Sequence, residues 1–416
     1  MSILNRYQGF EELELNGGVL PVEAAEAGAE ESVRAEIAEV QVELEQVSQE
    51  IEELRSEVAE QDEAVEEIQE VVAGLESLIN SGSFNSTAFA NMYNRAAKLN
   101  VKLGGVSIER CGVESMTDAA TAQVMARAGM EGFMEQVKGY AKKAVEVIKH
   151  IFNAVINFFV GIFSQIEKLS RRQEQLVKRL ADTEKLKEKV KLGGWNALYD
   201  YEKNGLKEGM DGYDATQSAL DKLTAVAAKP ASITVAGFNS AYTALTSALT
   251  ADTKKDLNAQ EKSEGDKKVL IGQYAGLRVH AEMKAGTAKD LGEAAELARS
   301  IKIFFGTGDT KKLASGEVAP KADKGELGRV LTAVKSSLTG FRSNKSEQAF
   351  SKAQRDQVIG SLNVLKADDK EKAEEVNKQV ALVRAIYAST SSVTQQTHKY
   401  FLRCAGWSLD AVAAHI

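Results

Sequence analysis

The chain has 416 residues, of which 44% are hydrophobic, 27% charged and only 6% aromatic. This length suits two or three domains, and the scarcity of proline beside abundant Ala, Glu, Lys, Gln and Leu favours helices over sheet. Two distant cysteines, Cys111 and Cys404, exclude a disulfide framework and indicate a reducing environment. No secretory signal opens the chain. The longest apolar run, residues 151–163, is shorter than the roughly 20 residues of a membrane span, so no transmembrane helix is predicted.

The formal net charge of −8 conceals a strong asymmetry. Residues 1–114 hold 24 acidic and 7 basic side chains, a net of −17, whereas residues 115–416 hold 36 acidic and 45 basic ones, a net of +9. Such an asymmetry indicates different partners for the two parts of the chain. The alternative is that the acidic part covers the basic part within one molecule.

The N-terminal part contains the clearest predicted element. Residues 1–30 are acidic and punctuated by glycine, so we expect a disordered leader. Residues 31–80 carry a heptad seam from Val33 to Ile79, interrupted at the polar Gln61, which predicts a coiled coil. Its flanks are mostly Glu and Gln, which disfavours a homodimer because like charges would face each other. The segment is predicted to pack on a basic partner, to form a loose oligomer or to pair with another helix of the same chain.

A second long helical pattern follows a mixed region. Residues 81–131 are expected to be a linker, and residues 132–193 a long basic amphipathic helix. Its basic residues are candidate contacts to phosphate or DNA: Lys138, Lys142, Lys143, Lys149, Arg171, Arg172, Lys178 and Arg179. Its apolar face is either a core face or a membrane-binding face. That face comprises Phe152, Ile156, Phe158, Phe159, Ile162 and Phe163.

The C-terminal half is predicted to be helical throughout. Residues 194–416 contain six to eight helical patterns, and only ASITVAGF at 231–238 hints weakly at a strand. The expected fold is therefore all-α, with an acidic N-terminal coiled coil, a long amphipathic central helix and a C-terminal helical bundle.

No motif in the sequence points to catalysis or to a cofactor. GTGDTKK at 306–312 lacks the spacing of a phosphate-binding P-loop, and the four histidines form no ligand pair. No zinc finger or other nucleic-acid module is present, so the excess of Lys and Arg supports only sequence-independent phosphate contact. We therefore expect a non-enzymatic protein with no cofactor, no catalytic residue and no metal site.

Gly-x-Glu tripeptides are concentrated in the acidic part. Five of the ten glycines in residues 1–131 are followed by x-Glu, against none of the 22 later glycines. Glu114 in GVES and Glu131 in GMEG are expected in breaks between helices, where a protease that cuts after Glu would find an extended chain. The alternative is helix capping, in which an acidic residue near a helix start interacts with the macrodipole.

The order of these features resembles the internal head proteins of large tailed bacteriophages, a family also labelled capsid and scaffold or virion structural proteins. The resemblance is carried by GVES at 112–115, GMEG at 129–132 and GFMEQVKGYAKKAVEVIKHIFNAVINFFVGIF at 132–163. It covers residues 100–190 and the acidic character of the leader, but not residues 194–416.

The resemblance implies a maturation pathway. The protein would pass from the host cytoplasm into the immature head with the capsid and scaffold proteins, where the maturation protease would remove the acidic propeptide. Glu114 or Glu131 would precede the final cut and Glu23 an early one, although GVE and GME depart from the usual Leu-x-Glu or Ala-x-Glu form. The basic part would then remain in the virion interior with the packaged DNA.

Two other functions stay open from the sequence. A membrane-active ejection or pore-type protein would use the helix at 133–163 at the membrane, and would be compatible with a phage origin. A cytosolic coiled-coil scaffold would instead work as an intact chain.

Overall fold

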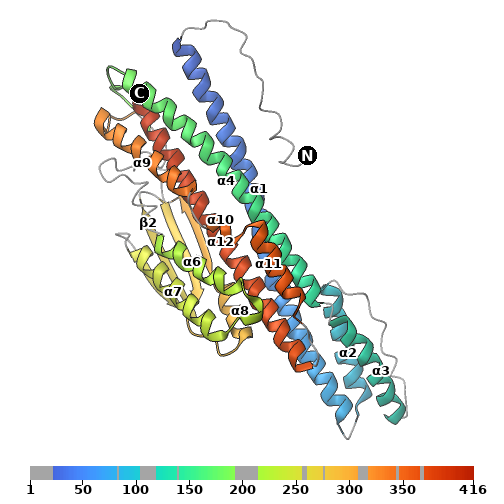
Figure 1. The fold of residues 1–416 in the computed structure, drawn as a ribbon. Coiled ribbons are helices and arrows are strands. Elements are labelled where there is room, and N and C mark those ends of the chain that lie inside the picture. Colours follow the sequence, from blue (N-terminus) through green and yellow to red (C-terminus); the bar gives the residue numbers. More distant parts are fainter. Residues whose placement is uncertain are drawn as a thin grey trace, which may run out of the picture.

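Three long helices form the framework of the protein. The computed structural model describes residues 22–81, 84–103, 119–137, 140–192, 214–254, 260–274, 277–307, 317–342, 346–365 and 370–416. Helices α1 (Val22–Asn80), α4 (Tyr140–Asp182) and α12 (Lys370–His415) lie side by side (Figure 1). Helix α1 runs antiparallel to the other two, since Glu36 meets Lys168 and Glu45 meets Lys399. Helices α4 and α12 run parallel.

The apolar seam of α1 packs within the chain. Its buried residues are spaced three, four or seven apart and share one core with α4 and α12: Val33, Ile37, Val40, Leu44, Ile51 and Val58. Gly161 lets α4 approach closely, because a Cβ there would lie 2.8 Å from Cδ2 of Leu44. The antiparallel pairing with helices of the same chain, left open by the sequence, is therefore what the structure contains.

A second core lies at the far end of α1. There α1 packs on α2 (Ser86–Lys102) and α3 (Ala119–Val137) around Ile68, Leu75, Phe89, Tyr93 and Phe133. Two packed helices thus occupy much of the region expected to be a linker. The expected boundary between residues 131 and 132 falls inside α3, and α4 begins only at Tyr140. The expected leader also overlaps α1, which starts at Val22.

Helix α12 lies at the centre and is buried along most of its length. Its polar run at residues 389–398 is largely buried, and three of its hydroxyls bond back to the helix. Thr390 Oγ1 donates to the carbonyl of Ile386 (2.8 Å) and Thr397 Oγ1 to that of Val393 (2.8 Å). These bonds let a Ser- and Thr-rich segment serve as a core helix.

A four-stranded antiparallel sheet lies beside α12 (Figure 1). Its strands follow the order β1 (Gln260–Glu264), β2 (Lys267–Tyr274), β3 (Leu277–Lys284) and β4 (Lys302–Thr307). Helix α7 (Val235–Lys254) contacts β2, α8 (Leu291–Ser300) contacts β3, and α12 contacts β4. The sequence did not predict this sheet. The all-α expectation is confirmed for the framework, since helices dominate the described residues.

The remaining helices cover the framework. Helices α9 (Lys324–Arg342) and α11 (Lys352–Asn363) pack on α4, and α6 (Asp214–Ala227) packs on α7 and α12. The short elements η4 (Pro230–Ser232) and α10 (Ser346–Ala349) complete the body. The weak strand expected at 231–238 is wrong. Thr234 instead caps α7, accepting from the Gly237 amide at 3.1 Å.

Candidate functional site

The acidic helix α1 lies against two helices of opposite charge. It carries 19 acidic and 2 basic residues, whereas α4 carries 8 basic and 4 acidic ones and α12 carries 6 basic and 4 acidic ones. Lys399 meets Glu45 at 2.5 Å, and Lys168 donates to the carbonyl of Glu36 at 3.1 Å. Exposed pairs of this kind contribute only about 0–1 kcal/mol each. The buried apolar seam therefore contributes most of the energy that holds α1 on α4 and α12. The opposite charges of these helices add a smaller attraction.

A buried ion pair network joins α1 to α12 and α8. Asp62 is 2% exposed and pairs with both Arg384 and Arg299, whose Nη1 lies 2.5 Å from the carboxylate. Arg384 also donates to Gln61 Oε1 at 2.9 Å. One carboxylate on α1 thus pairs with two guanidinium groups from elements more than two hundred residues away in the chain.

Arg55 extends this network along α1. It donates to Ser392 Oγ at 3.2 Å and to the Ile301 carbonyl, and lies 3.7 Å from Glu52. We call Glu52, Arg55, Asp62, Arg299 and Arg384 the ion cluster. Desolvation lowers the pKa of Arg55, although Glu52 opposes the shift. It lowers the pKa of Arg384 to about 10, opposed by Glu57. Three guanidinium groups thus share the carboxylates of Glu52 and Asp62, with Glu57 close enough to act on Arg384.

The irregular segment after α4 presents a row of lysines. Lys185, Lys187, Lys189 and Lys191 are all exposed, while the intervening Val190 is buried. Two backbone hydrogen bonds of 2.9 Å between Val190 and Val318 hold the segment in place. We call these four residues the lysine row. Glu184 and Glu188 lie in the same segment and are also exposed, so they offset part of the charge of the lysine row.

The outer side of α4 is less basic than the sequence indicated. Lys149, Arg171 and Lys178 are exposed there, but Glu146, Glu167 and Glu174 lie on the same side. Arg172 is 3% exposed and pairs with Asp410 at 2.7 Å, so it joins α4 to α12 rather than facing solvent. Arg179 is half-buried. Lys138 lies outside the described residues, as do the side chains of Lys142 and Lys143 at the start of α4.

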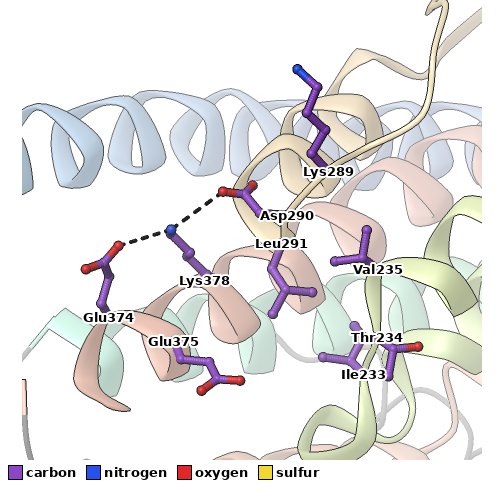
Figure 2. Close-up of a pocket in the computed structure, with 9 residues that line it drawn as sticks. All are labelled: Ile233, Thr234, Val235, Lys289, Asp290, Leu291, Glu374, Glu375 and Lys378. Atoms are coloured by element: carbon purple, nitrogen blue, oxygen red, sulfur yellow. Dashed lines mark ion pairs between the residues drawn. The ribbon is translucent and has the colours of Figure 1, made fainter. Parts of the chain in front are cut away.

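A cleft of about 550 Å³ opens where α7, α8 and α12 meet (Figure 2). Lys378 bridges Asp290 at 3.6 Å and Glu374 at 3.0 Å. A backbone bond from Glu293 lowers the pKa of Asp290, and the bond to Glu374 raises that of Lys378. Lys378 therefore compensates part of the charge of these two carboxylates, and Asp290 and Thr234 are the caps of α8 and α7. The cleft is explained by helix packing.

The described residues offer no evident reactive centre. Within them, no group of three or more His, Cys, Asp and Glu side chains could hold a metal ion. Burial raises the pKa of the Cys404 thiol to about 12 and lowers that of His398 to about 4. A thiol with so high a pKa is a poor nucleophile, and His398 is a core residue packed against Phe159.

Comparison with known proteins identifies the family. Residues 39–414 match the family described as phiKZ-like phage internal head proteins. The chain belongs to this family. No curated protein and no solved structure matches it. As a phage internal head protein, the chain is a structural component located inside the capsid. The match confirms the resemblance and extends it from α1 to the last turn of α12, including residues 194–414.

The three candidate cleavage sites of this internal head protein differ in setting. Glu114 lies outside the described residues. Glu131 is exposed but lies within α3, between the buried Met130 and Phe133, and not in a break between helices as expected. Glu23 lies in the first turn of α1, and its side chain is outside the described residues. A protease would have to unwind part of α3 before it cut after Glu131.

The apolar face of α4 lies in the core of the internal head protein. Phe152, Phe158, Phe159 and Ile162 are at most 4% exposed, and Ile156 and Phe163 are half-buried. The ring of Phe152 lies 4.6 Å from that of Tyr387 on α12. By length and composition, residues 145–182 form the one described helix that could cross a membrane, but half of the qualifying window is buried. Membrane binding through this face would require α4 to leave α12.

Sequence reasoning missed the ion cluster and the lysine row. The interruption of the heptad seam at Gln61 was the available signal for the cluster, since polar residues in a seam often have a specific partner and Gln61 accepts from Arg384. The partners could not be found, because Arg299 and Arg384 lie far away in the sequence. The lysine row was counted as the end of a helix, whereas the helix ends at Asp182.

Proposed function

We propose that this internal head protein enters the immature head as a full-length chain, without enzymatic activity of its own. The maturation protease then cuts after Glu114 or Glu131, with an earlier cut after Glu23, and the basic remainder stays with the packaged DNA. The observation that carries the proposal is the docking of an acidic helix on two basic ones. Before the cut, α1 reduces the attraction between the body and nucleic acid.

Cutting alone does not release α1 in this account. Its seam residues Leu44, Ile51 and Val58 are at most 3% exposed, and Asp62 anchors the ion cluster. We therefore propose two steps, cleavage followed by separation of the seam. After the second step the body carries the net positive charge of residues 132–416, with 44 basic and 34 acidic side chains.

The lysine row is the proposed contact to DNA phosphate. Changing all four lysines to Ala in the mature form should reduce the dependence of log affinity on log salt concentration by about 3–4, since each phosphate contact contributes about 0.9. The measurement is duplex DNA binding at several salt concentrations. The matched control changes Lys149, Arg171 and Lys178 to Ala on the charge-balanced side of α4 and should alter the slope less. Equal slopes for the two variants, or equal binding by full-length and mature protein at low salt, would contradict the proposal.

A further inference from the structure

A pocket of about 250 Å³ lies between α1, α8, β4 and α12. Helix α1 contributes Glu52 and Arg55, α8 contributes Arg299, β4 contributes Lys302 and Phe304, and α12 contributes Ser389. Four separate elements thus converge on it. It is distinct from the lysine row and from the cleft of Figure 2.

The pocket has an excess of positive charge. Three cationic side chains line it, Arg55, Arg299 and Lys302, against a single carboxylate, Glu52. Arg55 has a side chain only 10% exposed and Arg299 one only 16% exposed, so both charges are poorly solvated. Burial of a cation is costly unless an anion compensates it. The nearby Asp62 is already engaged by Arg299 and Arg384.

Two polar groups in the pocket have no partner within the described part of the chain. Ser389 is 1% exposed, and its Oγ makes no hydrogen bond there. A buried hydroxyl without a partner is destabilising, but this oxygen has almost no accessible surface and is not offered to a ligand in the pocket. Lys302 is exposed and pairs with none of the described carboxylates. An anion in the pocket would therefore lie beside two guanidinium groups and the ammonium group of Lys302.

Phe304 adds a flat apolar surface at the same site. Its side chain is 45% exposed, although large aromatic residues are usually covered in a folded protein. It lines the pocket together with Lys302, two residues earlier on β4. Cationic groups beside an exposed aromatic ring form the usual arrangement for a phosphate with a base stacked next to it.

We propose that this pocket binds the phosphate group of a nucleotide, with the base lying against Phe304. Arg55, Arg299 and Lys302 attract the phosphate, and Lys302 donates to one of its oxygens. The volume suits a single nucleotide unit rather than a duplex. The source is either a free nucleotide or one unit of a single strand.

The pocket exists only while α1 is docked, because α1 supplies Glu52 and Arg55. A ligand that binds only this arrangement stabilises it by mass action. The phosphate would therefore hold α1 on the body, and loss of α1 would abolish binding. This consequence rests on the proposed release of α1, whereas phosphate binding itself does not.

Calorimetric titration of the full-length protein tests the proposal. The probes are a deoxynucleoside 5′-monophosphate, the same nucleoside without phosphate, inorganic phosphate and a short single-stranded oligonucleotide. We expect saturable binding of the monophosphate at one site, weaker binding of inorganic phosphate and none of the nucleoside. Tighter binding of the oligonucleotide than of the monophosphate would identify a strand as the source, and the reverse order a free nucleotide.

Variants at the pocket supply the decisive comparison. Lys302→Glu should weaken monophosphate binding by about tenfold or more, as expected for loss of a charge-assisted contact. Lys302→Gln, which is milder for folding, should weaken it in the same direction. Phe304→Ala should weaken binding of the monophosphate but not of inorganic phosphate. Lys178→Glu, an exposed change on α4, is the matched control and should bind as the wild type does.

Several results would overturn the proposal. They are an absence of binding by any phosphate-bearing probe, equal affinity for nucleoside and monophosphate, or wild-type affinity in both Lys302 variants. The lysine-row variant separates this proposal from the proposed function, since it should lose duplex binding and keep monophosphate binding. A wild-type protein that binds duplex DNA but no monophosphate would therefore contradict only the pocket proposal. One that binds monophosphate but no duplex DNA would contradict only the proposed function.

Discussion

Replacing Asp62 by Asn should lower the free energy of unfolding by about 3–5 kcal/mol, the usual cost of removing one partner of a buried ion pair. Asp62 is 2% exposed and is shared by Arg299 and Arg384. Asparagine keeps the shape of the side chain but leaves both guanidinium groups without their shared carboxylate. Urea denaturation followed by circular dichroism measures the change.

Two further variants test this explanation. Glu53→Gln removes an exposed carboxylate from the same helix and should change stability by less than about 0.5 kcal/mol. Combining Asp62→Leu with Arg299→Met and Arg384→Met should recover much of the loss, because apolar residues of similar volume can replace a buried ion network. An Asp62→Asn protein as stable as the wild type would show that the ion cluster does not hold α1.

Truncation of Phe152 to Ala should destabilise the protein by about 3–5 kcal/mol. The side chain is fully buried, and its ring lies 4.6 Å from Tyr387 and 5.9 Å from Phe350. Its loss leaves a cavity between α4 and α12 and removes two aromatic contacts. The change is measured as a shift of the urea midpoint.

The matched control for Phe152 is Val160→Ala on the same helix. Val160 is 37% exposed, so its truncation should cost much less. Equal stabilities of the two variants would contradict the packing of α4 on α12. Such a result would favour the membrane-active function, in which the apolar face of α4 leaves the core.

The long helices were predictable because their apolar spacing is regular. The seam from Val33 to Ile79 predicts a helix with one buried side, and the structure contains that helix. Apolar spacing shows which side of a helix is buried but not which helix covers that side. The pairing of α1 with α4 and α12 is therefore known only from the structure. The placement of Glu131 in a break was wrong because Met130 and Phe133 bury their side chains and continue α3 through two glycines.

The sheet and the central position of α12 were not predictable by the same reasoning. Strand β1 has the sequence QEKSE, which is polar throughout and exposed at most positions, so it lacks the alternation that marks a half-buried strand. The run at residues 389–398 is rich in Ser, Thr and Gln, which indicates a surface in the sequence. The hydroxyls of Thr390, Ser391 and Thr397 bond to the helix backbone, which helps the run to lie in the core.

The candidate sites were also predictable where they depend on local spacing and not where they depend on contacts between distant residues. Four of the six apolar residues on α4 are buried, which is the core alternative left open by the sequence. The phosphate contacts were assigned by counting charge along a helix, and such counting does not reveal that Arg172 faces Asp410 or that Glu167 lies beside Arg171. The ion cluster and the nucleotide pocket depend on contacts between distant parts of the chain.

The central claim is that this internal head protein is cut after Glu in the head and loses its acidic helix. Intact mass and N-terminal sequencing of the protein from mature phage particles test it most directly. We predict a chain that begins at Ser115 or Gly132, without α1. A full-length chain that begins at Met1 or Ser2 would contradict proteolytic maturation and would leave α1 as a permanent part of the fold.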